Sequence, residues 1–409
     1  MKKRLIDRQN HIFFFALICF SAVLFLCYYN KDVNAINGTM LAFSYKYGFI
    51  SRGLIGTIYQ LLDRVLAADM MNYAAMRRYT QVITGIYYLI LFIFYGFCLR
   101  KCENESQRKT KYLIVFFTVF AIPMFCAFEN FGRLDIYMVM LSLLGAILII
   151  QEKFEFLLVP ISAIGVMVHQ GYVFMFLNVI LILLIYKTLT YHGKKRIKYG
   201  VLFLACFGVA SGLFLWFEFF SHMNGENIYA EIVARAESIC KDGYIHGDVI
   251  DHEILGIDLA DREWEYHLQN FVELPIFIMF MSPFLVYAVK FFVRLIKNTD
   301  NIEDKIKYVF VSIGALTIVP NFILKVDYGR WMFAIVCYYF VVILALLAMK
   351  DKHVERELFA VVNGMKEKYL CASISIGYLV LFQPFLAVPI CELTVTIARR
   401  LNELLLHLW

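Results

Sequence analysis

Long apolar runs recur along this chain and are separated by connections that carry most of its charge. A run of about 20 apolar residues can cross the hydrocarbon core of a bilayer as a helix. Roughly eleven runs approach that length: 11–29, 80–98, 112–128, 134–150, 154–169, 171–187, 200–221, 274–293, 307–324, 332–349 and 369–390. Because only helices and closed barrels satisfy their backbone in lipid, this pattern predicts an all-α, polytopic transmembrane helical bundle.

Composition excludes an ordinary soluble domain. Of the 409 residues, 61% are hydrophobic and 18% are charged, and the mean hydropathy is +0.68. Soluble domains run at about 45–50% apolar and about 25% charged. The net charge of +6 lies mainly in short connections, so we expect membrane lipids, and no nucleic acid, as partners. We expect residues 1–409 to form a single integral membrane domain.

Basic residues concentrate on alternate connections, which predicts the orientation of the spans. Lysines and arginines accumulate in 2–8, 100–111, 187–198, 290–307 and 350–368. Connections rich in Lys and Arg stay on the cytoplasmic side. The N-terminus is therefore expected in the cytoplasm, and an error of one span would destroy the alternation.

Two of the connections assigned to the outer side are long. Segment 30–79 mixes apolar and charged residues at helical spacing, which is typical of amphipathic helices at a membrane surface. Segment 222–273 is acidic and contains a stretch with helical spacing. We expect surface helices in the first segment and one ordered outer loop, a cap, in the second.

Three arginines on the outer side each have a glycine neighbour. Arg52 lies in "SRG", Arg133 in "FGR" and Arg330 in "YGR". Outer connections should be poor in arginine, glycine permits close approach of a ligand, and arginine binds phosphate through two hydrogen bonds. These arginines are therefore candidate ligands of a lipid-linked phosphate, with Lys325 as a weaker helper.

A purely structural alternative stays open for the same charges. Asp327 lies within one helical turn of Arg330, and Glu129 and Asp135 lie close to Arg133 along the chain. Such pairs could hold the arginines in place, or the arginines could bind lipid head groups.

Carboxylates on the same side are candidate catalytic groups. Transfer of a sugar to a hydroxyl group needs a base on the acceptor and stabilisation of the departing phosphate. Asp32, which directly follows the first predicted span, is the first candidate base, and Asp135, Glu129 and His169 are rivals. His169, next to Gln170, is alternatively a turn histidine or a hydrogen-bond donor to phosphate.

At these residues the chain resembles the GT-C-type membrane glycosyltransferases. The stretch "YYNKDVNAINGTMLAFSYKYGFISRGLIG" has the shape of that class, in which an acidic residue follows the first span and a long outer loop with surface helices comes next. The resemblance implies a polyprenyl-linked sugar donor and the catalytic role for Asp32. Many members have paired acidic residues where this chain has one Asp. No metal ligand is therefore assigned, and participation of a divalent metal stays open.

A second resemblance is to O-antigen and capsule polymerases and the related ligases. Arg52, Arg133, Arg330 and His169, with the loop 222–273, are similar to the outer-face arginines, histidine and large loop that hold an undecaprenyl-pyrophosphate saccharide in those enzymes. The alternative outside enzymology is a lipid-linked sugar flippase or transporter. Transporters usually show repeated halves with sites at the membrane midplane, whereas these polar residues gather on one side.

The sequence thus predicts a glycosyltransferase of cell-surface polysaccharide synthesis in the bacterial plasma membrane, with its active site on the outer face. Its donor would be a sugar on a polyprenyl (pyro)phosphate carrier, and its acceptor a glycan or a lipid. The alternatives are the polymerase or ligase and the flippase. The sequence leaves the sugar, the linkage and the choice between inversion and retention open.

Overall fold

The regular elements that can be described in this protein are all helical. The computed structural model describes residues 32–66, 69–99, 131–221, 227–247, 249–251, 273–324 and 328–363, together with 15, 19 and 223, and none of these lies in a strand. The prediction of an all-α protein is therefore confirmed for this part of the chain. Predicted spans 112–128 and 369–390, span 11–29 apart from residues 15 and 19, and the site residues Glu129, Lys325 and Asp327 lie outside the described residues.

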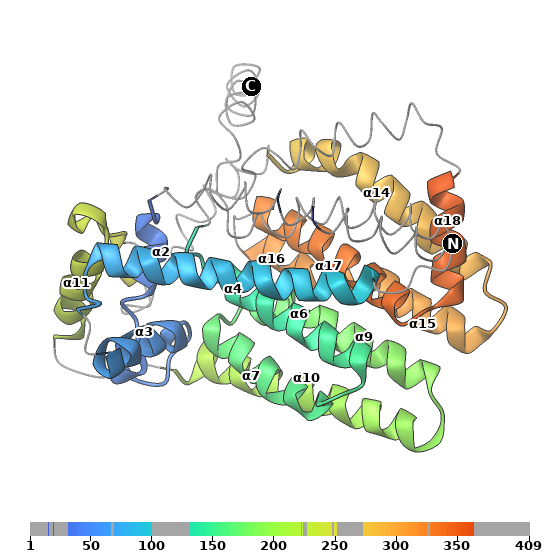
Figure 1. The fold of residues 1–409 in the computed structure, drawn as a ribbon, viewed down its shortest axis with the longest axis horizontal. Coiled ribbons are helices and arrows are strands. Elements are labelled where there is room, and N and C mark those ends of the chain that lie inside the picture. Colours follow the sequence, from blue (N-terminus) through green and yellow to red (C-terminus); the bar gives the residue numbers. More distant parts are fainter. Residues whose placement is uncertain are drawn as a thin grey trace.

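Long helices run beside one another to form the body of the protein (Figure 1). They are α4 (Tyr73–Leu99), α6 (Asp135–Gln151), α7 (Leu158–Val168), α9 (Leu177–Thr190), α10 (Gly193–Phe219), α14 (Glu273–Lys297), α15 (Ile302–Ile313) and α17 (Tyr328–Ala348).

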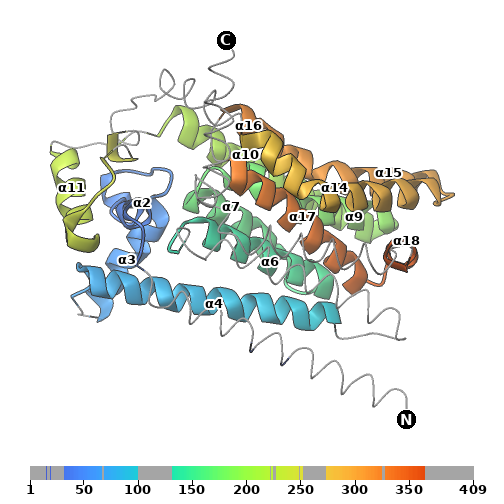
Figure 2. The ribbon, with the colours of Figure 1, turned by 90° about the horizontal axis from the view of Figure 1, so that it is seen from above.

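Shorter elements connect or cover these helices. They are α2 (Ala35–Met40), η1 (Tyr45–Tyr47), α3 (Gly53–Leu66), η4 (Glu155–Leu157), α8 (Tyr172–Met175), α11 (Ile228–Ile239), η5 (Lys241–Gly243), η6 (Gly314–Ile318), α16 (Val319–Leu324) and α18 (Lys352–Asn363). Helices α2, α3 and α11 gather at one end of the long helices, and α18 lies at the other (Figures 1 and 2). We call the end with α11 the cap end.

Three of the described helices are long and apolar enough to cross a membrane. They are Tyr73–Cys98, Gly193–Phe219 and Arg330–Ala348. This length and composition are those of a membrane protein, although the predicted count of eleven spans is not established by these three helices.

Helices α10 and α17 occupy contrasting places in the protein. In the apolar 18-residue stretch of α10, 17% is buried inside the protein, whereas 82% of the corresponding stretch of α17 is buried. Leu204 of α10 is 65% exposed, whereas Leu344 of α17 is fully buried. Helix α17 is therefore central, and α10 is peripheral with an apolar surface of the kind that usually contacts lipid or another protein.

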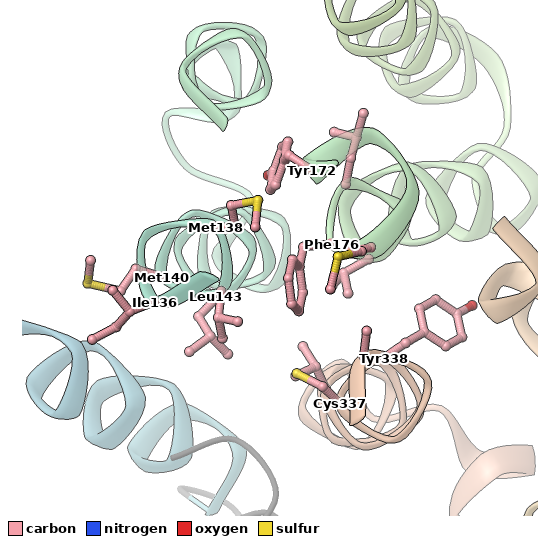
Figure 3. Packing of buried hydrophobic residues seen from close by; sticks show 14 of the residues in the cluster. Ile136, Met138, Met140, Leu143, Tyr172, Phe176, Cys337 and Tyr338 are labelled. Atoms are coloured by element: carbon pink, nitrogen blue, oxygen red, sulfur yellow. The ribbon is translucent and has the colours of Figure 1, made fainter. Parts of the chain in front are cut away.

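Part of the buried core lies between α6, α8, α9 and α17 (Figure 3). Phe176, at the junction of α8 and α9, is buried between side chains of α6 and α17, among them Leu143 and Cys337. Its carbonyl oxygen accepts a hydrogen bond from Ser142 Oγ at 2.5 Å. This bond satisfies a backbone group at a junction where the helix is interrupted.

Two of the predicted spans are broken rather than continuous. Span 171–187 is divided at Phe176 into α8 and α9, and span 307–324 passes from α15 through the 3₁₀ element η6 to α16. Asn178 Nδ2 donates to Thr317 Oγ1 at 3.0 Å, and that hydroxyl donates to the Phe174 carbonyl at 3.1 Å. Hydropathy did not predict these breaks because side chains from the facing helix supply the hydrogen bonds that they require.

Candidate functional site

A buried carboxylate at the cap end binds two of the predicted arginines. Asp135 begins α6 and is 1% exposed. Arg330 Nη2 lies 2.7 Å from its Oδ1 and 2.9 Å from its Oδ2, and Arg133 Nε lies 3.4 Å from Oδ2. We call Arg133, Asp135 and Arg330 the Asp135 triad. With two guanidinium groups and one carboxylate, it carries one net positive charge.

The packing of helices brings the members of the Asp135 triad together. Helix α17 packs against both α4 and α6, so Arg330, near the start of α17, reaches the first residue of α6. A carboxylate at the N-terminus of a helix is also favoured by the helix dipole. The Arg133 side chain is 20% exposed and that of Arg330 is 11% exposed, so part of each side chain remains accessible.

Gly132 allows this segment to approach its neighbours closely. Its φ of +89° lies in the region that favours glycine. A Cβ atom at this position would lie 3.0 Å from Val33 Cγ1 and 3.3 Å from Thr80 Cγ2. A larger residue would therefore push the Arg133 segment away from the chain at Val33 and from α4.

A second group of polar side chains surrounds Asp32. Lys241 Nζ lies 2.6 Å from Asp32 Oδ2, and Tyr73 OH donates to Oδ1 at 2.8 Å. The Val33 backbone N–H donates to the same tyrosine oxygen at 3.2 Å. The hydrogen bond from Lys241, followed by that from Tyr73, lowers the pKa of Asp32 below its ordinary value. We call Asp32, Tyr73 and Lys241 the Asp32 cluster.

The Asp32 cluster and the Asp135 triad are neighbours at the cap end. Asn37 Nδ2, in α2, donates to the Phe131 carbonyl at 2.9 Å in a buried hydrogen bond. Val33, which follows Asp32, lies against Gly132, which precedes Arg133. The chain that follows Asp32 thus packs against the chain that precedes Arg133.

An ion pair and hydrogen bonds bind the segment around α11 to segment 30–79. Lys46 Nζ lies 2.6 Å from Glu231 Oε2, and Arg235 Nη2 donates to the carbonyl oxygens of Leu41 at 3.4 Å and Gly56 at 3.3 Å. Figure 2 shows α11 beside α2 and α3. The described part of 222–273 therefore packs against segment 30–79.

The remaining predicted residues are placed by other contacts. Arg52 has a φ of 64° and directly precedes α3. His169 ends α7 and its Nδ1 accepts from the Gly171 N–H at 2.8 Å, while Gln170 Nε2 donates to Glu218 at 3.1 Å. The structure therefore brings together two of the three predicted arginines, and the contacts described for His169 and Gln170 run to Gly171 and Glu218.

Sequence reasoning missed the partners that tertiary structure supplies. Lys241, Tyr73 and Arg235 were not predicted as site residues. A signal for two of them was present, because Lys241 and Arg235 are among the few cations of the acidic segment 222–273. The carboxylate that binds Arg330 among the described residues is Asp135, 195 positions away along the chain, and no sequence spacing reveals such a pair.

No family model, characterised protein or solved structure matches this chain. Its chemistry has to be inferred from its own residues. In the described ranges, no three His, Cys, Asp or Glu side chains come close enough to hold a metal ion. The single carboxylate of the Asp32 cluster, bound by an ammonium group and a phenol, does not provide the several oxygen ligands that a divalent cation requires.

Proposed function

We propose that this protein is an integral membrane glycosyltransferase of cell-surface polysaccharide synthesis. It transfers a sugar from a polyprenyl (pyro)phosphate carrier to a glycan or lipid acceptor at the outer face of a bacterial plasma membrane. The observation that carries this proposal is the convergence of Arg133 and Arg330 on buried Asp135, next to Asp32. In this proposal, phosphate binding and proton transfer take place on chain segments that pack together.

In this proposal the Asp135 triad binds the phosphate of the carrier. The positive charge of the triad attracts an anion, and its two guanidinium groups are held before the ligand arrives because Asp135 is already bonded to them. Preorganised donors of this kind stabilise charge that develops on a leaving group without further reorganisation. Asp135 is therefore a positioning residue in this proposal, not the base.

Asp32 is the proposed base. The acceptor hydroxyl passes its proton to a carboxylate oxygen of Asp32. The oxygen of the acceptor hydroxyl then forms a bond with the anomeric carbon of the donor sugar. The bond between that carbon and the phosphate oxygen breaks, and its electron pair leaves with the phosphate. Half exposure of the Asp32 side chain gives an acceptor access to this carboxylate.

The membrane orientation in this proposal follows the charges and the exposed apolar surface. About eleven spans place the cap end outside and the N-terminus in the cytoplasm. The exposed apolar side of α10 contacts lipid, and α3 lies at the surface with Ile58, Leu61 and Val65 exposed towards the bilayer. A carrier with its chain in the bilayer would then present its phosphate near the cap end.

Release of the carrier tests this function directly. The purified protein, incubated in nanodiscs with a polyprenyl-linked sugar and an acceptor extract, is expected to release the carrier, and Asp32→Asn should abolish release while thermal stability is retained. Glu231→Gln, which alters another exposed lysine partner at the same end, is the control. Full activity of Asp32→Asn would remove Asp32 from the mechanism, and transport of the lipid-linked sugar without turnover would favour a flippase.

A specific feature of His169 supports a polymerase or ligase as second candidate. Since Nδ1 accepts from Gly171, a neutral imidazole carries its proton on Nε2 and can donate there to a phosphate oxygen. Inactivity of His169→Ala and Arg330→Ala together with full activity of Asp32→Asn would support this candidate.

A further inference from the structure

Lys241 is held at its backbone while its ammonium group is exposed. It begins η5, directly after Cys240, whose sulfur lies 3.9 Å from Thr39 Oγ1 in the buried contact between the cap and α2. The chain then turns sharply, with φ of 55° at Asp242 and 69° at Gly243. The Lys241 side chain is 49% exposed, so its four-carbon stem can move its charge while the backbone stays in place.

Asp32 has two polar partners with different surroundings. Tyr73 OH, which binds Oδ1, accepts from the Val33 N–H and is therefore fixed by the backbone. Lys241, which binds Oδ2, reaches Asp32 across solvent-exposed space, and an exposed ion pair of this kind is readily broken. Removal of Lys241 would thus leave the carboxylate oriented by Tyr73.

The pairing with Lys241 opposes the proposed role of Asp32. A carboxylate whose two oxygens both accept hydrogen bonds, one from an ammonium group, is a weak base, as the lowered pKa of Asp32 indicates. Among the described residues, the charged and titratable groups that act on this carboxylate are Lys241 from η5 and Tyr73 and Arg77 from α4. Of these, Lys241 is the cation with a direct ion pair to it.

We propose that, when the donor binds, the ammonium group of Lys241 leaves Asp32 and binds the phosphate of the lipid carrier. This inference rests on the proposed function. An ammonium group binds phosphate as a mobile point charge, and the chain that precedes the Asp135 triad packs against the chain that follows Asp32. Donor binding then frees Oδ2 of Asp32 for the acceptor hydroxyl, so the base becomes effective once the donor is in place.

The chain contains a matched control for Lys241. Lys46 also forms a 2.6 Å ion pair between the first outer segment and the cap, and its side chain and that of Glu231 are 58% and 48% exposed. Loss of either lysine therefore removes one exposed contact of the cap. Of these two lysines, Lys241 is the one that binds Asp32.

The first test is binding, measured as the shift in thermal unfolding midpoint with polyprenyl phosphate in nanodiscs. Lys241→Ala should weaken binding about 10- to 100-fold, as expected for loss of a charge-assisted contact, whereas Lys46→Ala should bind like wild type and Lys241→Arg should recover most of the affinity. Equal affinity of Lys241→Ala and wild type would overturn the inference.

The second test is the pH profile of carrier release. Without Lys241 the pKa of Asp32 should rise, so the acid limb of kcat/KM in Lys241→Ala should move to higher pH, while that of Lys46→Ala should stay in place. If the acid limb of Lys241→Ala does not move and its KM for donor is unchanged, the proposed role of Lys241 is refuted, while the proposed glycosyltransferase function stands. If polyprenyl phosphate binds in a Lys241-dependent way but the wild type shows no turnover, the proposed transferase function is refuted, while the contact between Lys241 and phosphate stands.

Discussion

Arg330 and Asp135 form a buried ion pair between the starts of two helices that lie 195 positions apart in sequence, with both carboxylate oxygens within 2.9 Å of one guanidinium nitrogen. Asp135→Ala is expected to destabilise the protein by about 3 kcal/mol, because it leaves two guanidinium groups without their buried anion. Thermal or denaturant unfolding in detergent measures this. Glu231→Ala, at an exposed pair, should change stability little, and equal effects of the two variants would contradict the buried role of Asp135.

Replacement of the two arginines by lysine should separate charge from geometry. A lysine keeps the charge, but its single nitrogen cannot bind Asp135 while a second nitrogen of the same group binds phosphate, as a guanidinium can. Arg330→Lys should therefore raise the KM for donor about tenfold or more, and Arg133→Lys, whose contact with Asp135 is looser at 3.4 Å, should have a smaller effect. The measurement is carrier release at varied donor concentration. A larger rise in KM for Arg133→Lys than for Arg330→Lys would show that Arg133 contributes more to donor binding.

Glu152, in the turn after α6, makes stability depend on pH at the end opposite the cap. Burial alone would raise its pKa, but hydrogen bonds from Lys187 and Tyr191 outweigh this and lower it from 4.5 to about 2. Because the folded-state pKa is the lower one, the stabilisation is complete above about pH 4.5 and is lost as pH falls towards 2. The Glu152 side chain is 29% exposed, so we expect about 1–3 kcal/mol from this shift.

Glu152→Gln should therefore flatten the fall in unfolding free energy between pH 4.5 and 2. The control variant is Glu303→Gln. The Glu303 side chain is 44% exposed, and its contact with Arg196 is longer, at 3.8 Å. The same acid slope in Glu152→Gln and wild type would show that another group controls the acid response.

Gly56 allows α3 to approach the chain before it. A Cβ at this position would fall on the carbonyl oxygen of Phe43 and within 2.6 Å of that of Leu41. Gly56→Ala should cost about 1–3 kcal/mol and speed proteolysis within 41–60. Gly96→Ala, in α4 with nothing within 4 Å, should be neutral or stabilise by about 0.5–1 kcal/mol. Equal outcomes would argue against the close approach.

Because α10 is exposed and α17 is buried, we expect α10 to contact lipid and α17 to be shielded from it. A single cysteine at Leu204, in a cysteine-free background, should react with a bilayer-soluble label in nanodiscs, and one at Leu344 should not, because these side chains are 65% and 0% exposed. Labelling can be measured by mass spectrometry. Reaction at Leu344 alone would contradict the central place of α17.

Apolar periodicity was sufficient to predict helices over 134–150, 154–169 and 332–349, because each run is long and contains few charges. It failed at Phe176 and at 314–318, where the helices break. Those breaks depend on Asn178 and Ser142, whose partners lie on other helices. A local pattern carries no information about such distant hydrogen bonds.

The sequence by itself determined that the chain is helical and rich in apolar segments, and that Arg133, Arg330, Asp135 and Asp32 are unusual charges for their surroundings. Hydropathy, charge alternation and glycine neighbours are local properties, so they can be read along the chain. Only the tertiary structure decided that Arg330 binds Asp135 and that Lys241 binds Asp32. Those pairs form because helix packing brings together residues that are nearly 200 or more positions apart, and ion pairs depend on distance in space.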